Sequence, residues 1–465
     1  MMARLRSVYS CSECGHSEPK WAGQCPGCGA WSSLVEEAVE VRSAAGERAA
    51  PRSLTDFSSE VVPLSGTEGP AEERLATGIG EFDRLLGGGL VAGQVALLAG
   101  PPGIGKSTLM LQVAGKLASS GKVLYVSGEE SLGQISGRAK RLGVRSEQIL
   151  LLAETDLHKI VNAISEHGPR VVVLDSIQTV CRADMTGGAG SVGQVRECAA
   201  ELLRAVKKRG SVLFLLGHVT KEGSVAGPMV LEHLVDTVLQ FDLEARQSLR
   251  ILRAQKNRFG SASELGLFEM FEGGLREVSD ASAFFIEELG EGAGAGRAVS
   301  VAMEGNRPIL AEVQALVTPT RYPLPRRMAT GLDLNRVLVL VASLEKHLRL
   351  RLESKDVYLN VAGGLRLRDP ALELAACLAI LSSARDEALP ADQVFLGEVG
   401  LLGRLGRIGL LDRRLQEAGR AGFKKAVVSA RSLAALRQSG GNPSIEVFGA
   451  EDLRSAAAVS FKENP

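Results

Sequence analysis

The chain has 465 residues, which is enough for two or three domains with separate hydrophobic cores. Its 54 Lys and Arg balance 54 Asp and Glu, so any contact with nucleic acid or an anionic membrane needs a local charged patch. No apolar stretch is long enough to span a membrane, and residues 1–10 lack the apolar core of a signal peptide, so we expect a soluble, cytoplasmic protein.

Four of the seven cysteines crowd near the start of the chain in two Cys-x-x-Cys pairs, Cys11 with Cys14 and Cys25 with Cys28. A glycine follows each pair, and such turns let four thiolates enclose one ion in a tetrahedral Zn²⁺ site. Two disulfides or a redox Cys-x-x-Cys are the alternatives. We favour structural zinc, because so short a segment needs a staple to fold.

We assign residues 1–34 to this C4 zinc finger, or zinc knuckle. Trp21 and Trp31 either cover the knuckle or present a contact surface, and we slightly favour packing. Residues 35–71 are rich in Glu, Ala, Ser, Pro and Arg without periodicity, which predicts a linker.

The most specific motif is a G-x-x-x-x-G-K-[ST] phosphate loop between an apolar run at 95–99 and an apolar-periodic segment at 108–118. This strand–loop–helix context disfavours a glycine-rich turn without a nucleotide. Lys106 would bridge the β- and γ-phosphates, and the Ser107 hydroxyl would ligate Mg²⁺. The expected ATP-binding residues of the loop are Gly100, Pro101, Pro102, Gly103, Ile104, Gly105, Lys106, Ser107 and Thr108.

Further apolar runs at 122–127, 170–175 and 212–218 alternate with helical segments, which predicts a doubly wound α/β domain. Glu129, Asp175 and His218 follow or end these strands, and ligands of such sheets bind at the carboxyl ends of the strands.

Each of these polar residues has a chemical interpretation and an ordinary one. Asp175 sits where a Walker-B acid holds Mg²⁺ through water. Glu129 is the candidate that orients and deprotonates the attacking water, with Glu130 second; a solvated acidic turn is the alternative. His218 either senses the γ-phosphate or is a buried histidine with structural hydrogen bonds.

Residues Lys256 to Gly260 have the sequence Lys-Asn-Arg-Phe-Gly. This segment matches the hallmark motif of the bacterial RadA (Sms) DNA-repair ATPase family. With the four-cysteine knuckle and the phosphate loop added, the chain resembles that family over nearly its whole length. The resemblance implies a RecA-like P-loop core that binds ATP and Mg²⁺. It also implies a homo-oligomeric ring, a hexamer, that acts on single-stranded and branched DNA beside a RecA-type recombinase filament and promotes branch migration.

Carried over by motif, Lys256 and Arg258 would reach a neighbour's ATP phosphates as trans-acting cations, or would contact DNA. The loops at 182–193 and 219–227 match the positions of DNA-binding loops in RecA-like proteins. Arg182 and Lys221 thereby become candidate contacts to DNA phosphates.

A glycine-rich stretch at 290–296 predicts the boundary between an ATPase domain at 72–289 and a C-terminal α/β domain at 290–465. The latter resembles the proteolytic domain of Lon proteases, which needs a serine nucleophile and a lysine base. Ala371 and Asp412 occupy those positions, so we expect no proteolysis.

Two alternatives stay open in this domain. Ser382 or Ser383 with Lys355 would be a different dyad, although nothing in the sequence places them together. A basic face is either solvated or follows DNA; its residues are Arg349, Arg351, Lys355, Arg366 and Arg368. Rival functions are an ATP-dependent protease, and a RecA-like ATPase that regulates protein partners without DNA.

Overall fold

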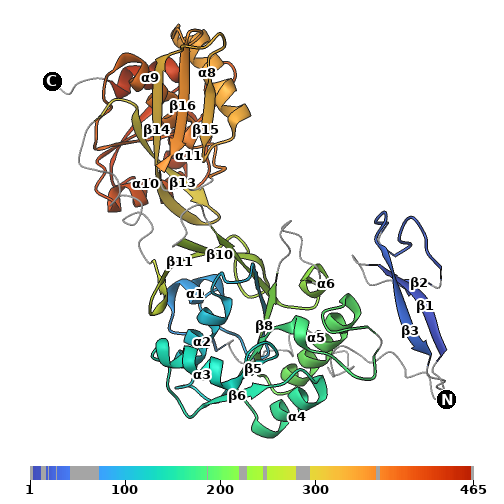
Figure 1. Ribbon diagram of the computed structural model, residues 1–465. Coiled ribbons are helices and arrows are strands. Elements are labelled where there is room, and N and C mark those ends of the chain that lie inside the picture. Colours follow the sequence, from blue (N-terminus) through green and yellow to red (C-terminus); the bar gives the residue numbers. More distant parts are fainter. Residues whose placement is uncertain are drawn as a thin grey trace. The chain divides into compact units, whose positions relative to one another are not determined.

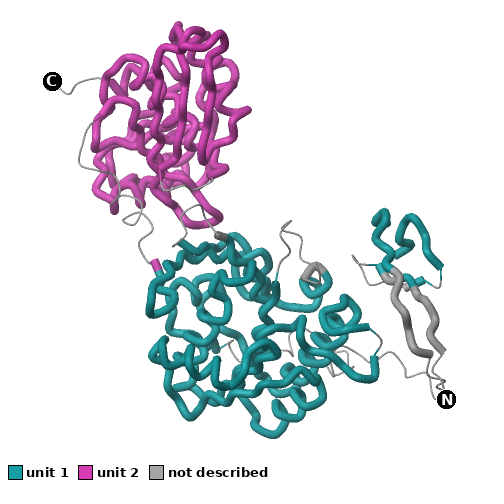
Figure 2. Tube along the Cα trace, viewed as in Figure 1, with its two compact units in different colours: residues 1–243, 248–277 teal, residues 244–247, 278–465 magenta. Residues whose placement is uncertain are grey.

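The computed structural model describes residues 4–11, 17–18, 20–27, 29–41, 73–185, 187–218, 228–243, 249–278, 294–362 and 367–461. The chain divides into two compact units, residues 1–243 with 248–277 and residues 244–247 with 278–465 (Figure 2). The second unit therefore begins before the glycine-rich stretch at which the sequence places the boundary. Among the described residues, no helix has the length and apolar character needed to cross a lipid bilayer.

The N-terminal segment forms a small antiparallel sheet. Its strands are β1 (Arg4–Cys11), β2 (Ser17–Glu18) and β3 (Leu34–Val41), in the order β2-β1-β3. β1 and β3 pair along their whole length, from Arg4 opposite Val41 to Cys11 opposite Leu34. Residues 35–41, which the sequence assigns to the linker, are thus part of a strand, because the full length of β1 supplies its hydrogen-bonding partner.

The main domain of unit 1 is built on one long sheet (Figure 1). In the described residues it has nine strands in the order β12-β11-β10-β9-β4-β8-β7-β5-β6. The strands from β9 to β6 run parallel, and β10 to β12 continue the sheet antiparallel. The strands are β4 (Val95–Gly100), β5 (Val123–Ser127), β6 (Ile149–Ala153), β7 (Val171–Asp175), β8 (Val212–His218), β9 (Thr237–Leu243), β10 (Leu249–Asn257), β11 (Leu265–Phe271) and β12 (Gly274–Glu277).

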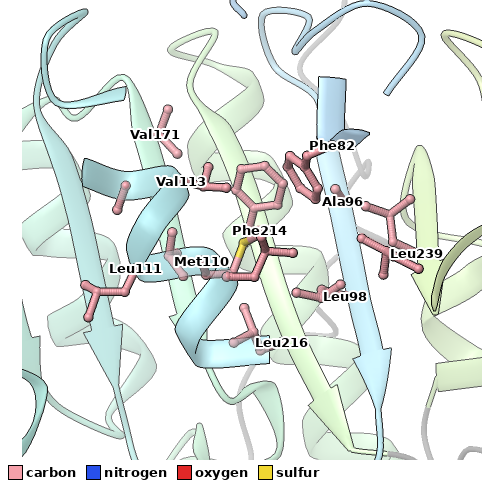
Figure 3. Close-up of a cluster of buried hydrophobic side chains, with 14 of the residues drawn as sticks. Phe82, Ala96, Leu98, Met110, Leu111, Val113, Val171, Phe214, Leu216 and Leu239 are labelled. Atoms are coloured by element: carbon pink, nitrogen blue, oxygen red, sulfur yellow. The ribbon is translucent and has the colours of Figure 1, made fainter. Parts of the chain in front are cut away.

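Helices cover both faces of this sheet, as a doubly wound fold requires. On one face, α2 packs over the central strands, and Phe82 meets Phe214 with ring centroids 6.0 Å apart (Figure 3). A second core, built around α4 and α5, covers the other face. The helices are α1 (Gly80–Leu85), α2 (Lys106–Leu117), α3 (Leu132–Arg141), α4 (Leu157–His167), α5 (Val192–Lys207) and α6 (Pro228–Glu232).

Unit 2 is a second α/β structure. Its described residues form a seven-stranded sheet in the order β15-β16-β14-β13-β17-β20-β21, and a short hairpin of β18 and β19. The strands are β13 (Arg297–Glu304), β14 (Arg307–Pro319), β15 (Arg327–Thr330), β16 (Lys355–Val361), β17 (Gln393–Leu396), β18 (Glu398–Val399), β19 (Leu405–Gly406), β20 (Lys425–Ser429) and β21 (Glu446–Ala450). The helices are α8 (Leu334–Leu348), α9 (Leu372–Arg385), α10 (Leu411–Arg420), α11 (Ala430–Gln438) and α12 (Leu453–Ser460).

Candidate nucleotide site

The phosphate loop connects β4 to α2, as the sequence predicts. Gly103 and Gly105 have φ angles of 75° and 117°, a region that L-residues with side chains rarely adopt. A Cβ on Gly105 would also lie 2.9 Å from Cε of Met270. Glycine at these positions lets the backbone turn sharply into the N-terminus of α2, where free N–H groups favour an anion.

Lys106 points back onto the loop and donates three hydrogen bonds. They go to the carbonyl oxygens of Gly100 at 2.8 Å and Pro101 at 3.1 Å, and to Nδ1 of His218 at 3.2 Å. Burial lowers the pKa of Lys106 to about 8, although the carboxylates of Asp175 and Glu129 oppose this shift. An ammonium group has only three protons, so a bound phosphate must replace at least one of these partners.

Asp175 ends β7 beside Lys106, and its carboxylate is buried. Tyr125 of β5 donates its hydroxyl to Oδ2 of Asp175 at 2.9 Å. Burial, and then the charge of Asp175, raise the pKa of Tyr125 well above its usual value, so the phenol stays a donor. Asp175 is therefore a buried carboxylate held in place by Tyr125 at the carboxyl end of the sheet, next to the loop.

Glu129 lies after β5 and joins the same cluster. Its Oε1 accepts a hydrogen bond from Oγ of Ser176 at 2.6 Å and lies 3.2 Å from Nε2 of His218. Partial burial alone would raise the pKa of Glu129, but the hydrogen bonds from Ser176 and His218 outweigh it, and Lys106 adds a positive charge. The pKa of Glu129 consequently lies below its usual value, and the group is an anion at neutral pH.

Glu130 makes different contacts from those of Glu129. Its Oε1 pairs with Arg138 of α3, and its backbone N–H donates to Oγ of Ser127 at 3.0 Å. The structure thus joins Glu129 to Lys106, through His218, while Glu130 is held by Arg138.

Gly128 lets Glu129 approach the end of β7. Its N–H donates to the carbonyl oxygen of Asp175 at 2.9 Å, and a Cβ at this position would lie 2.1 Å from Oγ1 of Thr179. We expect Gly128→Ala to push Glu129 out of place and lower ATP turnover at least about tenfold, because small misplacements of a catalytic group are costly. Steady-state ATP hydrolysis checks this. Gly137→Ala in α3, where a Cβ meets no atom within 4 Å, is the control and should keep parental turnover.

The Lys256–Gly260 segment lies at the opposite end of the sheet. β10 runs antiparallel to β9, and Asn257 pairs with Thr237, the first residue of β9. Since β9 runs parallel to β4, whose carboxyl end carries the phosphate loop, Lys256 cannot reach the loop of its own chain.

Some residues of this segment fix its backbone, and others carry its charge. Asn257 donates to the carbonyl oxygen of Leu85 at 3.0 Å, and a Cβ on Gly260 would lie 2.9 Å from Cα of Gly87, so both anchor the turn. Lys256 and Arg258 carry its positive charges. Arg258 is more than half exposed and lies 3.3 Å from the buried carboxylate of Asp236.

Lys256 is held more firmly than Arg258. Its Nζ donates to the carbonyl oxygens of Glu232 at 2.5 Å and Val235 at 2.8 Å. Burial and then the neighbouring Arg258 charge lower the pKa of Lys256. These two contacts engage two of the three ammonium protons, and the third remains for a ligand.

The structure does not present Arg182 as a free cation. It pairs with Asp184 and, through NH1, with Glu201 at 3.0 Å, and its side chain is 17% exposed. A DNA phosphate would have to compete with both carboxylates for this charge. Lys221, the other expected DNA contact, lies outside the described residues.

Residues 70–224 match the model of an AAA domain. Over 461 residues the chain is 48% identical to the DNA repair protein RadA of Bacillus subtilis, covering 99% of this chain and all of that protein. The chain belongs to the RadA family of DNA repair proteins. The RadA protein of Halalkalibacterium halodurans is 45% identical, again over 99% of this chain and all of that protein.

Among solved structures, a KaiC-like protein from Pyrococcus horikoshii is similar at 21% identity and a TM-score of 0.39, covering 44% of this chain and 99% of that one. The family and the α/β architecture confirm the predicted fold class, a RecA-like P-loop core preceded by a metal-binding ribbon.

Residues 9–36 match the model of a rubredoxin metal-binding domain. Of the four cysteines, Cys11 and Cys25 are described, and both are buried. The N–H of Gly27 donates to Sγ of Cys25 at 3.3 Å, the kind of contact that stabilises a thiolate ligand. Cys14 and Cys28 lie outside the described residues. The buried thiols and this N–H···S contact fit a bound metal ion.

The tryptophans of the ribbon correct one expectation. Trp21 and Trp31 are 59% and 74% exposed, so they do not pack as a cover over the knuckle. A Cβ on Gly23 would lie 3.8 Å from an atom of each ring, which places both indoles next to this residue. They form an exposed aromatic surface, the alternative that the sequence left open.

In unit 2, Ala371 is fully buried at the start of α9, and Asp412 is exposed in the first turn of α10. The hydroxyls of the two alternative serines are hydrogen-bonded to backbone groups. Ser382 accepts from the N–H of Gly296 at 2.9 Å, and Ser383 accepts from the N–H of Val317 at 2.9 Å. In the described part of the chain, neither serine is hydrogen-bonded to Lys355.

Of the expected basic face, Arg366 lies outside the described residues, and Arg349, Arg351 and Arg368 are exposed.

Proposed function

We propose that this RadA-family protein is a DNA-dependent ATP hydrolase that works as a motor, promoting branch migration of recombination intermediates during repair in the cytoplasm. The cluster of Lys106, Glu129, Asp175 and His218 beside the phosphate loop carries the ATPase part of the proposal. Membership of a DNA-repair family supports DNA as the polymer on which the motor acts.

For hydrolysis, Lys106 leaves His218 and binds the β- and γ-phosphate oxygens. Glu129, an anion at neutral pH, orients a water molecule and accepts its proton. Asp175 and the Ser107 hydroxyl offer the hard oxygen ligands that Mg²⁺ prefers, and the ion, when bound, neutralises charge on the phosphates. His218 loses its bond to Lys106 at the same moment. Because it ends β8 directly before the 219–227 loop, it would relay the presence of the γ-phosphate to that loop.

Lys256 and Arg258 complete the site from a neighbouring subunit. Their place at the opposite end of the sheet from the phosphate loop supports this assignment, since it rules out action on the same chain's nucleotide. A ring of such subunits, a hexamer by our proposal, would hold ATP at each interface. Direct DNA contact is the alternative role for the two cations.

We further propose that Cys11, Cys14, Cys25 and Cys28 hold a structural Zn²⁺. Unit 2 is proposed as a Lon-like scaffold without protease activity, because Ala371 has no nucleophile and the hydroxyls of Ser382 and Ser383 serve backbone groups.

Steady-state ATP turnover with and without single-stranded DNA, at two salt concentrations, tests the proposal. We expect DNA to raise turnover several-fold and the apparent DNA affinity to fall as salt rises, because phosphate contacts release counterions. Turnover that is indifferent to DNA would favour the rival in which the ATPase regulates protein partners. If the purified protein still digested casein in an ATP-dependent manner, the result would favour the rival function of an ATP-dependent protease.

A further inference from the structure

Ser176 is a residue of the nucleotide site that the motifs do not mark. It follows Asp175 directly, its side chain is fully buried, and its Oγ lies 2.6 Å from Oε1 of Glu129. A hydroxyl facing a carboxylate at this distance donates a charge-assisted hydrogen bond, which is stronger than one between neutral groups.

The other donor to Glu129 reaches the same oxygen. Because the Lys106 ammonium can only donate, Nδ1 of His218 accepts from it, and the ring proton sits on Nε2. Nε2 then donates to Oε1 of Glu129 at 3.2 Å. Within the described part of the chain, Oε2 of Glu129 has no hydrogen-bond partner, so it is the oxygen that can accept a proton.

The turn that carries Ser176 is fixed against the backbone beside Glu129. Oγ1 of Thr179 donates to the carbonyl oxygen of Ser176 at 2.8 Å, closing the turn. Gly128 packs on Thr179 and donates its N–H to Asp175. Hydrogen bonds to the backbone therefore fix both ends of the Ser176–Glu129 contact, which is what an accurately placed catalytic group needs.

The two contacts on Glu129 respond differently to nucleotide. The His218 contact depends on Lys106, which must exchange at least one of its acceptors when phosphate binds. The Ser176 contact involves no group that binds phosphate, so it persists through the reaction.

We propose that Ser176 is a positioning residue for ATP hydrolysis, holding one oxygen of Glu129 so that the other faces the attacking water. This inference rests on the proposed ATPase function. The water oxygen bonds to the γ-phosphorus, the bond from that phosphorus to the β–γ bridging oxygen breaks, and ADP leaves. The water proton passes to Oε2 of Glu129 and then to solvent, while Ser176 keeps its own proton.

Ser176→Ala in the full-length protein is the test. We expect kcat for ATP to fall about tenfold with KM within twofold of the parent, because the variant loses orientation of the base and not nucleotide contacts. The acidic limb of the kcat–pH profile should move to higher pH. The lost hydrogen bond favoured the ionised form, so without it the pKa of Glu129 rises and the base is protonated at a higher pH. Ser176→Thr, which keeps the hydroxyl, should restore at least half of the lost rate.

Ser211→Ala is the matched control. Ser211 is also buried, and its hydroxyl donates to the carbonyl oxygen of Pro169 at 2.7 Å, at the other end of the sheet. Its kcat should equal that of the parent. A kcat for Ser176→Ala within twofold of the parent, or a slower kcat with an unmoved acidic limb, would overturn the inference. If the parent itself did not hydrolyse ATP, the proposed function would fail first, and the two failures are therefore distinguishable.

Discussion

Glu129→Gln is expected to lower kcat for ATP hydrolysis by a factor of at least about 100 while ATP still binds. The amide has the shape of the carboxylate but cannot accept the water proton. The pKa of Glu129 lies below its usual value, so the parental group is a ready base at neutral pH. Steady-state turnover measures the loss, and equilibrium binding of a fluorescent ATP analogue shows whether the nucleotide site is intact.

Glu130→Gln is the matched control, since it makes the same chemical change one residue away. Glu130 is paired with Arg138 and makes no contact with Lys106 or His218 in the described residues. We expect its turnover to stay within about threefold of the parent, the scale of an indirect effect. If Glu130→Gln lost turnover and Glu129→Gln kept it, the assignment of the base would be reversed.

Arg414→Leu is expected to destabilise unit 2 by roughly 3–5 kcal/mol, the cost of leaving a buried charge unpaired. NH1 of Arg414 lies 2.5 Å from Oδ2 of Asp369, and the two side chains are 5% and 9% exposed. The same NH1 donates to the carbonyl oxygen of Val301 at 2.6 Å. Asp369 also accepts from the N–H of Ala371 at 2.9 Å, so the ion pair fixes the start of α9.

Hydrogen–deuterium exchange of α9 and α10 peptides in the intact chain measures this loss locally. Arg420→Ala is the control, because Arg420 is 83% exposed and lies 3.9 Å from Glu417, a pair of little energetic value. Protection factors in Arg414→Leu that matched those of Arg420→Ala would show that the buried pair does not support the unit.

Much of the ATPase core could be predicted because its signals are local. The strands at β4, β5, β7 and β8 are short apolar runs, and a phosphate loop between strand and helix is hard to mistake. The edge strand β6 is a five-residue apolar run that fits a buried helix turn equally well, and the antiparallel strands β11 and β12 carry no motif. Pairing with distant neighbours decides these elements, and a local pattern does not contain it.

The sequence predicts most residues of the site but not the hydrogen bonds and ion pairs between them. Glu129 and Glu130 are equivalent in sequence, and Arg138 of α3 separates them. Ser176 carries a faint signal, a serine directly after the acid that ends a strand, but its contact with Glu129 spans 47 positions. The antiparallel pairing of β10 with β9 places Lys256 at the far end of the sheet, which no local motif could indicate.

In the proposed ring, one chain supplies Lys106 and Glu129 while a neighbour supplies Lys256 and Arg258. Mixing two inactive full-length variants, Lys106→Ala and Lys256→Ala, and measuring ATP turnover with single-stranded DNA tests it most directly. In a ring mixed at random in equal amounts, about a quarter of interfaces regain both intact halves, so we predict about a quarter of parental turnover. Turnover of the mixture no higher than the mean of the separate variants would contradict a site shared between subunits.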